Sequence, residues 1–254
     1  MMGLFSAFKK LLDGPGFVTS DNSRELDGDE RRAIAMGHIY AREGGLPIDA
    51  LTMEADQPTT QKLLARAWGV VDHDSYLDTM GWLRETGHRS LYPIVTPLVD
   101  RSIAERAWSK AANAIQAEGV AEAERQGLDG GQAALFFRGW LRSTVSGGRA
   151  ELPVPLPASI AAWDCARAVQ LSRLAVDAGF TTDAEAFGLL THFVTISREH
   201  HQSWQEFGDA FVTGRAFWCA KDVKNPVDQE LRSFTLARDD LIRREDSPWR
   251  TAAW

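Results

Sequence analysis

Two arginines occupy positions on the apolar faces of predicted helices, where a guanidinium can bind an anionic group. In one predicted helix the inward stripe places Arg167 one turn after Trp163, and in a later helix it places Arg215 just before Trp218. The planar guanidinium grips a carboxylate or a phosphate through two parallel hydrogen bonds. We therefore expect each arginine to contact either an internal acid or an anionic ligand.

Two interpretations of these arginines remain open, because a buried charge costs several kcal/mol unless it is paired. In the structural one, which we favour, Arg167 pairs with Asp164 and Arg215 pairs with another acid, so that the pairs fix helix register. In the functional one, both arginines line a Trp-walled cleft, and Asp164 or Glu206 would be the acid–base group if the protein is an enzyme. The candidate cleft residues are Trp163, Asp164, Arg167, Trp204, Arg215 and Trp218.

The elements that would position these side chains are helices, since apolar residues recur at helical spacing and period-two alternation is nearly absent. We predict an all-α fold, a single helical domain of about eight to ten helices. The predicted helices span residues 27–44, 59–68, 72–87, 99–118, 132–145, 159–178, 183–200, 203–220 and 226–244. Prolines predict an extended linker over 91–97 and a surface crossing over 146–157.

The predicted domain organisation is an N-terminal amphipathic helix and linker over 1–22, followed by a helical domain over 23–254. Residues 1–12 carry an apolar stripe with Lys9 and Lys10 on the other side. Docking onto the body of the protein is favoured over weak contact with a membrane surface. Similar helix–Gly–helix hairpins at Gly69 and Gly179 suggest two related helical halves, although such hairpins are also common by chance.

Composition narrows the class of partner. The 254 residues are 44% apolar and 25% charged, which is typical of a globular domain, and the net charge is −7. An acidic chain is a poor primary binder of nucleic acid, although Arg138, Arg142 and Arg149 leave a local basic strip. The acidic charge would instead steer the chain toward a protein partner, and a basic one in particular.

Cysteine content and hydropathy narrow the location. Only two cysteines occur, and no apolar run reaches the length of a membrane span. We therefore expect a cytoplasmic protein without a transmembrane segment.

Signatures of catalysis and of cofactor binding are missing from the sequence. His192, Glu199 and His200 share one predicted helix, but neither a His-Glu-x-x-His pattern nor a pair of Glu-x-x-His patterns is present. The sequence also lacks a phosphate-binding glycine loop and a Gly-x-Ser-x-Gly elbow. We expect no metal and no cofactor, and we favour a non-enzyme.

Four short motifs together resemble a known family. They are Trp68-Gly69-Val70, Gly87-His88-Arg89, the Trp-Asp-x-x-Arg run from Trp163 to Arg167, and the run from Ser203-Trp204 to Gly214-Arg215 and Trp218. Over residues 62–220 the chain resembles the bacterial YbeU/YbeR-like group, classed as domain of unknown function 1266. The resemblance implies a bacterial, cytoplasmic, helical domain, and proteins of such groups occur beside toxin genes as neutralising partners.

Three hypotheses for function follow from these observations. The first is a binding protein that neutralises a toxin or regulates a partner protein. The second is an enzyme that acts on an anionic or phosphodiester substrate in a Trp/Arg-lined cleft. In the third, the polar pairs are purely structural.

Overall fold

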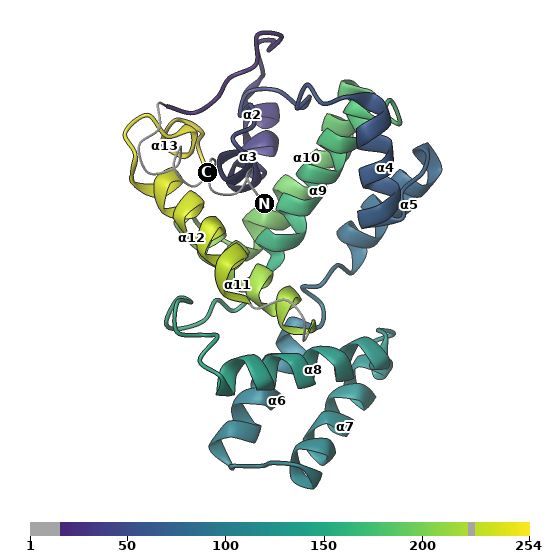
Figure 1. Ribbon diagram of the computed structural model, residues 1–254, viewed down its shortest axis with the longest axis vertical. Coiled ribbons are helices and arrows are strands. Elements are labelled where there is room, and N and C mark those ends of the chain that lie inside the picture. The colour runs from purple at the N-terminus through teal and green to yellow at the C-terminus, as the bar shows by residue number, and fades with distance from the viewer. Residues whose placement is uncertain (1–15, 223–226) are drawn as a thin grey trace.

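The chain folds into helices only, over the part that the computed structural model describes, which is residues 16–222 and 227–254 (Figure 1). Within these residues the helices are α2 (Gly28–Ala35), α3 (His38–Gly44), α4 (Gln57–Trp68), α5 (His73–Glu85), α6 (Tyr92–Ala104), α7 (Lys110–Arg125), α8 (Gly130–Val145), α9 (Ala161–Asp177), α10 (Asp183–His200), α11 (Trp204–Ala220), α12 (Val227–Arg243) and α13 (Pro248–Thr251). The prediction of a single all-α domain is confirmed.

Helix α9 is the centre of the fold, because thirteen of its seventeen residues are buried. It packs against α10, α11, α3, α4 and α5, so that it is covered from several sides. Figure 1 shows α9 and α10 side by side, with α2 and α3 on one side of them and α4 and α5 on the other. A polar side chain on α9 is therefore enclosed unless it reaches the gap between two of these covering helices.

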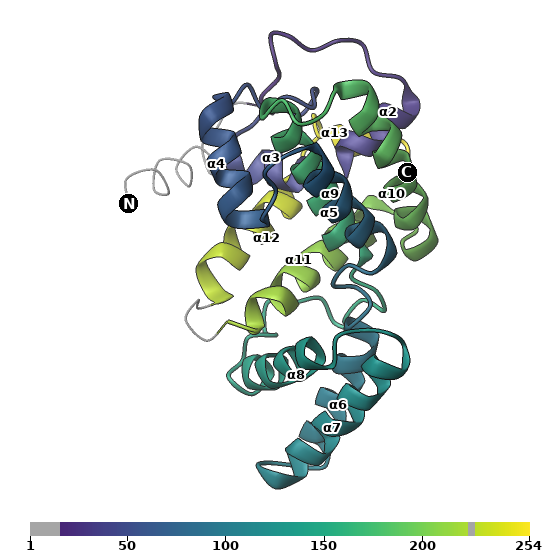
Figure 2. The ribbon, with the colours of Figure 1, turned by 90° about the vertical axis from the view of Figure 1, so that its right-hand side faces the viewer.

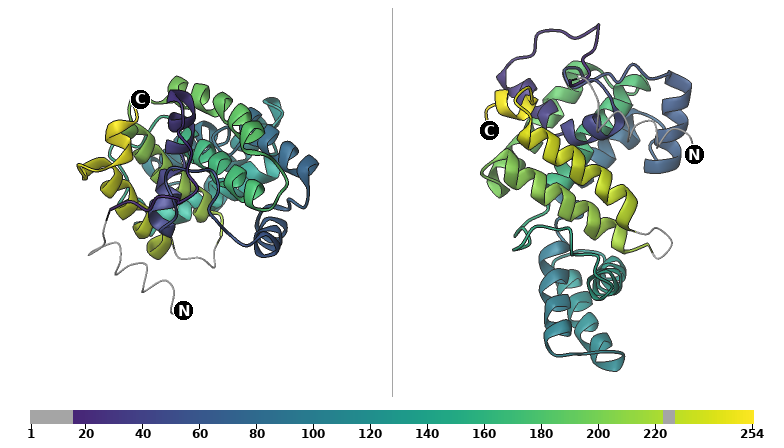
Figure 3. Two further views of the ribbon diagram at one scale, coloured as in Figure 1. Left: turned by 90° about the horizontal axis from the view of Figure 1, so that it is seen from above. Right: turned by 60° about the vertical axis from the view of Figure 1, so that its left-hand side comes forward.

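Helices α6, α7 and α8 form an arm that extends from one end of the body (Figures 1 and 2). The arm joins the body through α8 and α11, which lie in close contact. A Cβ added at Gly139 would meet the backbone oxygen of Ala220 at 2.3 Å, and the rings of Phe136 and Phe217 stack at 4.6 Å. Figure 3 shows that α12 also lies alongside α11.

Side-chain caps define the starts of four helices that the sequence predicts well. Asp56, Asp72, Thr182 and Ser203 each accept a hydrogen bond from a backbone N–H in the first turn of the following helix. The predicted bounds of α10, 183–200, are confirmed, because the sequence carries both this cap and a continuous apolar stripe.

The predicted linker over 91–97 is wrong, because α6 begins at Tyr92 and contains Pro97. Proline is tolerated in a first helical turn, where its missing N–H has no partner to lose, and Pro93 lies there. Pro97 does forgo a backbone hydrogen bond, but burial of the apolar face of α6 outweighs that loss. The apolar residues on this face are Tyr92, Ile94, Val95 and Val99.

Two predicted helices are each divided in the structure. The prediction over 99–118 is broken between α6 and α7, where Arg106 and Ser109 have φ values of +51° and +53°. The prediction over 27–44 is broken before α3 at Gly37, where an added Cβ would lie 2.5 Å from Val169 of α9. This break lets the backbone approach α9, and α3 then ends in a left-handed residue at Gly45 rather than at Gly44.

Three further predictions concern connecting segments and the chain end. Residues 146–160 contain no helix, as expected for the crossing, and both Gly69 and Gly179 have the positive φ of a helix stop. Whether the two hairpins record a duplication stays a prediction. The amphipathic segment 1–12 and the first residue of the predicted helix 226–244 lie outside the described residues. Of the helices in residues 16–222 and 227–254, none is long and apolar enough to cross a membrane.

The contact between α9 and α11 predicts a sharp effect of one methyl group. A Cβ at Gly214 would lie 2.4 Å from Cβ of Trp163, an atom that cannot move without the helix backbone. We expect Gly214→Ala to lower the free energy of unfolding by about 1–3 kcal/mol, measured by urea denaturation. Gly81→Ala is the matched control, since Gly81 lies inside α5 with open space around its Cβ. It should stabilise by about 0.5–1 kcal/mol, and equal effects of the two changes would contradict this packing.

Candidate functional site

A buried carboxylate near the start of α9 organises the site. Asp164 has no exposed side-chain surface, and it accepts hydrogen bonds from the backbone N–H groups of His88 at 3.1 Å and Arg89 at 2.9 Å. The Arg89 guanidinium donates a third bond at 3.3 Å. Gly87 has φ +56°, and a Cβ there would lie 2.1 Å from the carboxylate. The turn after α5 therefore requires glycine, and Asp164 holds this turn against α9.

Opposing effects act on the pKa of Asp164. Burial raises it above the ordinary range, because a carboxylate loses its hydration. The charges of Arg167 and Arg89 and the two backbone N–H groups act in the other direction. The carboxyl group is thus fully engaged by the protein itself.

Arg167 is bonded most closely to a neutral side chain. Its Nη1 donates to Nδ1 of His88 at 2.8 Å, whereas Oδ1 of Asp164 lies 3.9 Å away. Because a guanidinium has no acceptor, Nδ1 of His88 carries a lone pair and Nε2 carries the proton. Burial, together with the positive charges of Arg167 and Lys221, lowers the pKa of His88 to about 2. Arg167 and Arg89 therefore share one carboxylate. Because that carboxylate is distant from Arg167, it neutralises the charge of Arg167 only in part.

Three tryptophan rings surround the Arg167 guanidinium. Its central carbon lies 4.6 Å from the ring centre of Trp68, 5.5 Å from Trp82 and 5.6 Å from Trp163. Each contact of this kind contributes about 0.5–1 kcal/mol at an exposed site and more where water is excluded. The rings come from α4, α5 and α9, so the arginine is held where these three helices meet.

Further cations continue the same arrangement along α11. The guanidinium of Arg215 lies 5.6 Å from Trp163, on a ring that Arg167 also contacts, and 5.0 Å from Trp218. The ammonium of Lys221 lies 4.9 Å from that same Trp218. We call Lys221, Trp218, Arg215, Trp163 and Arg167 the cation–aromatic row. Burial and the charge of Arg167 lower the pKa of Lys221.

One end of the row opens into a hollow between α4 and α5. The hollow has a volume of about 350 Å³ and is lined by Ala67, Trp68, Asp78, Thr79, Trp82 and Arg167. This volume falls in the range of about 300–1,000 Å³ that small-ligand sites occupy. The Arg167 side chain is 13% exposed and Trp82 is 39% exposed, so both reach the open space.

The structure brings most of the predicted cleft residues together. Trp163 and Trp218 pack at 5.8 Å between ring centres and stand with Arg167 and Arg215 in the row. Asp164 lies beneath the row, enclosed, with the Arg167 guanidinium within 4 Å. Arg167 is neither exposed nor fully enclosed. It therefore agrees in part with each interpretation that the sequence leaves open, an internal pair with Asp164 and a residue that lines a cleft.

Trp204 and Glu206 lie elsewhere, at the start of α11. Nine residues separate Glu206 from Arg215, which is about 14 Å along a helix. The Glu206 carboxylate accepts from the backbone N–H of Gln202 at 2.8 Å and so helps to cap the helix. The Trp204 ring stacks on Trp249 at 5.2 Å. Neither residue contributes to the hollow.

The partners of Arg167 from α4, from α5 and from the turn after α5 are not among the candidate site residues that the sequence indicates. Trp68, His88 and Arg89 belong to the quoted motifs, whereas Trp82 belongs to none of them. The spacing that puts Arg167 on an apolar stripe says nothing about which helices cover that stripe. The signal in the sequence that points to this turn is the Gly87-His88-Arg89 motif at a predicted helix end, and the structure gives Gly87 a positive φ.

A second arginine of α9 is buried more deeply than Arg167. Arg173 is 1% exposed and donates to the backbone oxygens of Pro47, Leu51 and Thr52. Burial lowers its pKa to about 10. Its contacts fix the segment between α3 and α4, so Arg173 has a structural role, although it acts through backbone oxygens and not through the acid pairing that the sequence suggested for Arg167.

A comparison with known families finds a match over most of the chain. The model of a family of proteins of unknown function, DUF1266, matches residues 63–254. The chain belongs to the DUF1266 family. The match extends beyond the 62–220 range of the motif resemblance to include α12 and α13, while α2 and α3 precede it. No curated protein and no solved structure matches the chain.

All the side chains that define the hollow and its buried support fall within the matched DUF1266 region. In the described ranges, no three His, Cys, Asp or Glu side chains are grouped so that they could hold a metal ion.

The buried neutral state of His88 predicts a pH effect on stability. Its pKa is about 2 in the folded protein and near 6.5 when unfolded, so below pH ~6.5 only the unfolded chain binds the proton. Titration of His88 therefore leaves the free energy of unfolding unchanged above pH ~6.5. Below that pH, acidification lowers the free energy of unfolding by up to ~1.4 kcal/mol per pH unit. His88→Gln should flatten the plot of unfolding free energy against pH by up to that slope. Parallel plots for the two proteins would show that His88 titrates alike in both states.

Proposed function

We propose that this protein is a non-catalytic binding protein that recognises an anionic group in the hollow between α4 and α5. One observation carries the proposal. Arg167 reaches this hollow with a neutral imidazole as its nearest hydrogen-bond partner, and the Asp164 carboxylate lies 3.9 Å away. A guanidinium held in this way presents an incompletely neutralised charge to a carboxylate or phosphate.

The surroundings of Arg167 favour tight anion binding for two further reasons. Three tryptophan rings fix the guanidinium and exclude water from its sides, which strengthens an ionic contact. The positive charges of Arg215 and Lys221 continue behind it along the row. The net charge of the whole chain is −7, so this positive region is local and selective rather than a general property of the surface.

Binding is favoured over catalysis because the acid–base candidates do not reach the hollow. The Asp164 carboxylate is fully enclosed and engaged by backbone N–H groups, and Glu206 caps α11 at a distance. Burial raises the pKa of the Cys165 thiol, which donates to the backbone oxygen of Phe193. The alternative of an enzyme that acts on an anionic substrate would have to use Asp78 at the rim of the hollow.

The ligand that fits best carries a carboxylate or phosphate next to a flat or apolar part. The anion would contact Arg167, and the flat part would lie on the exposed face of Trp82. An acidic or phosphorylated side chain of a partner protein meets this description. The toxin-neutralising or regulatory role, the YbeU/YbeR-like subgroup, the bacterial origin and the cytoplasmic location stay proposals that rest on the motifs and composition.

Replacement of Arg167 tests the proposal directly. Inorganic phosphate and a phosphoserine peptide serve as probes, and binding is followed through the fluorescence of the hollow's tryptophans and by calorimetry. We expect Arg167→Ala to weaken binding at least tenfold, because the ionic contact is lost (~1.4 kcal/mol or more). Arg167→Lys should be intermediate, since an ammonium keeps the charge but not the planar fork.

Arg84→Ala is the matched control, because Arg84 is an exposed arginine on α5 that forms an ion pair with Glu85. It should bind the probes as the unaltered protein does. An equal loss in both variants would indicate general electrostatic attraction, and turnover of a phosphorylated probe would contradict the non-catalytic assignment.

A further inference from the structure

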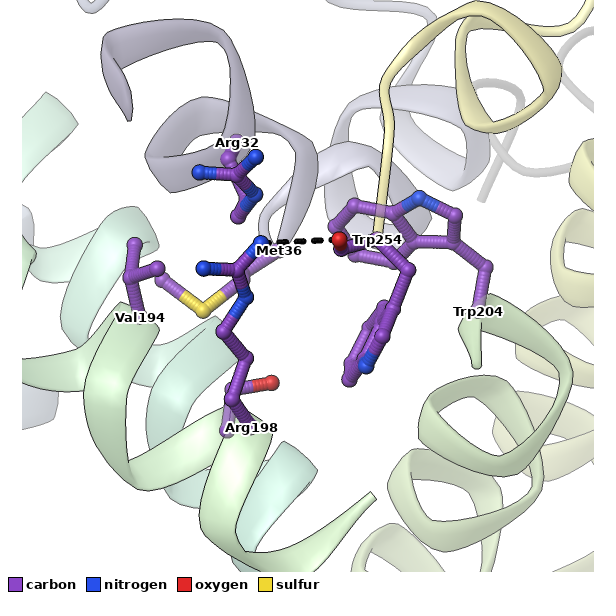
Figure 4. A pocket seen from close by; sticks show the side chains of 7 residues that line it. Arg32, Met36, Val194, Arg198, Trp204 and Trp254 are labelled. Carbon is purple, nitrogen blue, oxygen red and sulfur yellow. Dashed lines mark hydrogen bonds between the residues drawn. The ribbon is translucent and has the colours of Figure 1, made fainter. Parts of the chain in front are cut away.

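Residues 252–254 lie against the body of the protein, and we call them the tail. The residues that surround them are different from those that line the hollow. The residues that surround it, the tail groove, come from α2, α10 and α11 and are Arg32, Met36, Val194, Ser197, Arg198 and Trp204. Figure 4 shows the Trp254 side chain between the Trp204 ring and the two arginines.

Side chains of the groove bind the backbone of the tail at every residue. The main-chain oxygens of Ala252, Ala253 and Trp254 each accept a hydrogen bond from a different donor. In that order, the donors are Nε1 of Trp204 at 2.9 Å, Nε of Arg32 at 3.1 Å and Nη2 of Arg198 at 2.8 Å. Contacts to main-chain oxygens do not depend on the side chains of the peptide, so another extended segment could form them equally.

Selectivity in the groove comes from its aromatic end. The Trp254 ring packs edge-on against Trp204 at 4.8 Å between ring centres, and its indole N–H donates to the backbone oxygen of His201 at 3.2 Å. Trp204 is in turn stacked on Trp249, which anchors it. The groove thus favours a large aromatic residue at the position of Trp254.

The tail does not use everything that the groove offers. The Ser197 hydroxyl is 97% buried beside the Trp254 ring and has no hydrogen-bond partner within the described residues. The exposed Arg198 guanidinium forms no ion pair with a described carboxylate. A peptide with an acidic or hydrogen-bonding group near its aromatic residue would engage both side chains.

We propose that the tail groove is a peptide-recognition site for a partner protein, and that the chain's own tail occupies it as an internal competitor. The partner segment is extended, with an aromatic residue at the position of Trp254 and an acidic or polar group nearby. Its binding requires displacement of the tail, which exposes Trp204. This site is separate from the anion-binding hollow and does not depend on the function proposed for it.

The test uses the full chain with Trp254→Ala, which weakens the internal competitor. The probe is a fluorescent synthetic peptide of residues 247–254, and its binding is measured by anisotropy. A tethered competitor acts at an effective concentration of about millimolar, so we expect the variant to bind the probe at least tenfold more tightly than the unaltered chain. A peptide with alanine in place of its last tryptophan should not bind.

Two changes on α10 supply the controls. Arg198→Ala, added to Trp254→Ala, should weaken probe binding at least fivefold, because a charge-assisted bond is lost (~1 kcal/mol). The neighbouring exposed Glu199→Ala should leave probe binding unchanged.

Three results would overturn the proposal. A folded Trp254→Ala chain that fails to bind the probe would show that the groove does not recognise peptides in trans. An unfolded variant would place the tail in the core rather than in a binding site. A concentration-dependent dimer of the unaltered chain, absent in the variant, would make the occupant the tail of a second copy.

Discussion

The hydrogen bonds between the Asp164 carboxylate and the turn at Gly87 are the interaction on which the site depends. They place the backbone of His88 and Arg89 against the first turn of α9. His88 is thereby positioned to accept from Arg167 as a neutral imidazole, which leaves the arginine's charge directed at the hollow. Loss of one partner of such a buried pair costs about 3–5 kcal/mol, so this carboxylate is a main support of the geometry of the site.

The cation–aromatic row explains how several positive charges are kept close together in an acidic protein. Trp163 separates Arg167 from Arg215, and Trp218 separates Arg215 from Lys221. Each ring presents a negative face to the cations beside it, which offsets part of their repulsion. Trp163 is a buried core residue of α9, and Trp218 of α11 is partly buried and packs against the core, so the row is built from side chains that also stabilise the fold.

The bounds of helices could be predicted from the sequence better than the contacts between them. The bounds of α10 were predictable because its start carries Thr182 as a cap and its apolar stripe is continuous. The break at Gly37 was not, because it arises from close contact with Val169 of α9. Arg167 could be identified on an apolar stripe, but Trp68, Trp82 and His88 belong to other helices, and their contacts with it follow from tertiary packing alone. Arg173 shows the same limit, since the carbonyls that bind it are distant in sequence.

The proposed binding of an anion by Arg167 in the hollow between α4 and α5 can be followed by nuclear magnetic resonance of the arginine side-chain N–H groups while inorganic phosphate is added. We expect a saturable shift of the Arg167 Nε signal, while the enclosed Arg173 signal stays in place. An Arg167 signal that does not move, or one that moves in step with exposed arginines such as Arg84, would show that Arg167 does not bind an anion in this hollow.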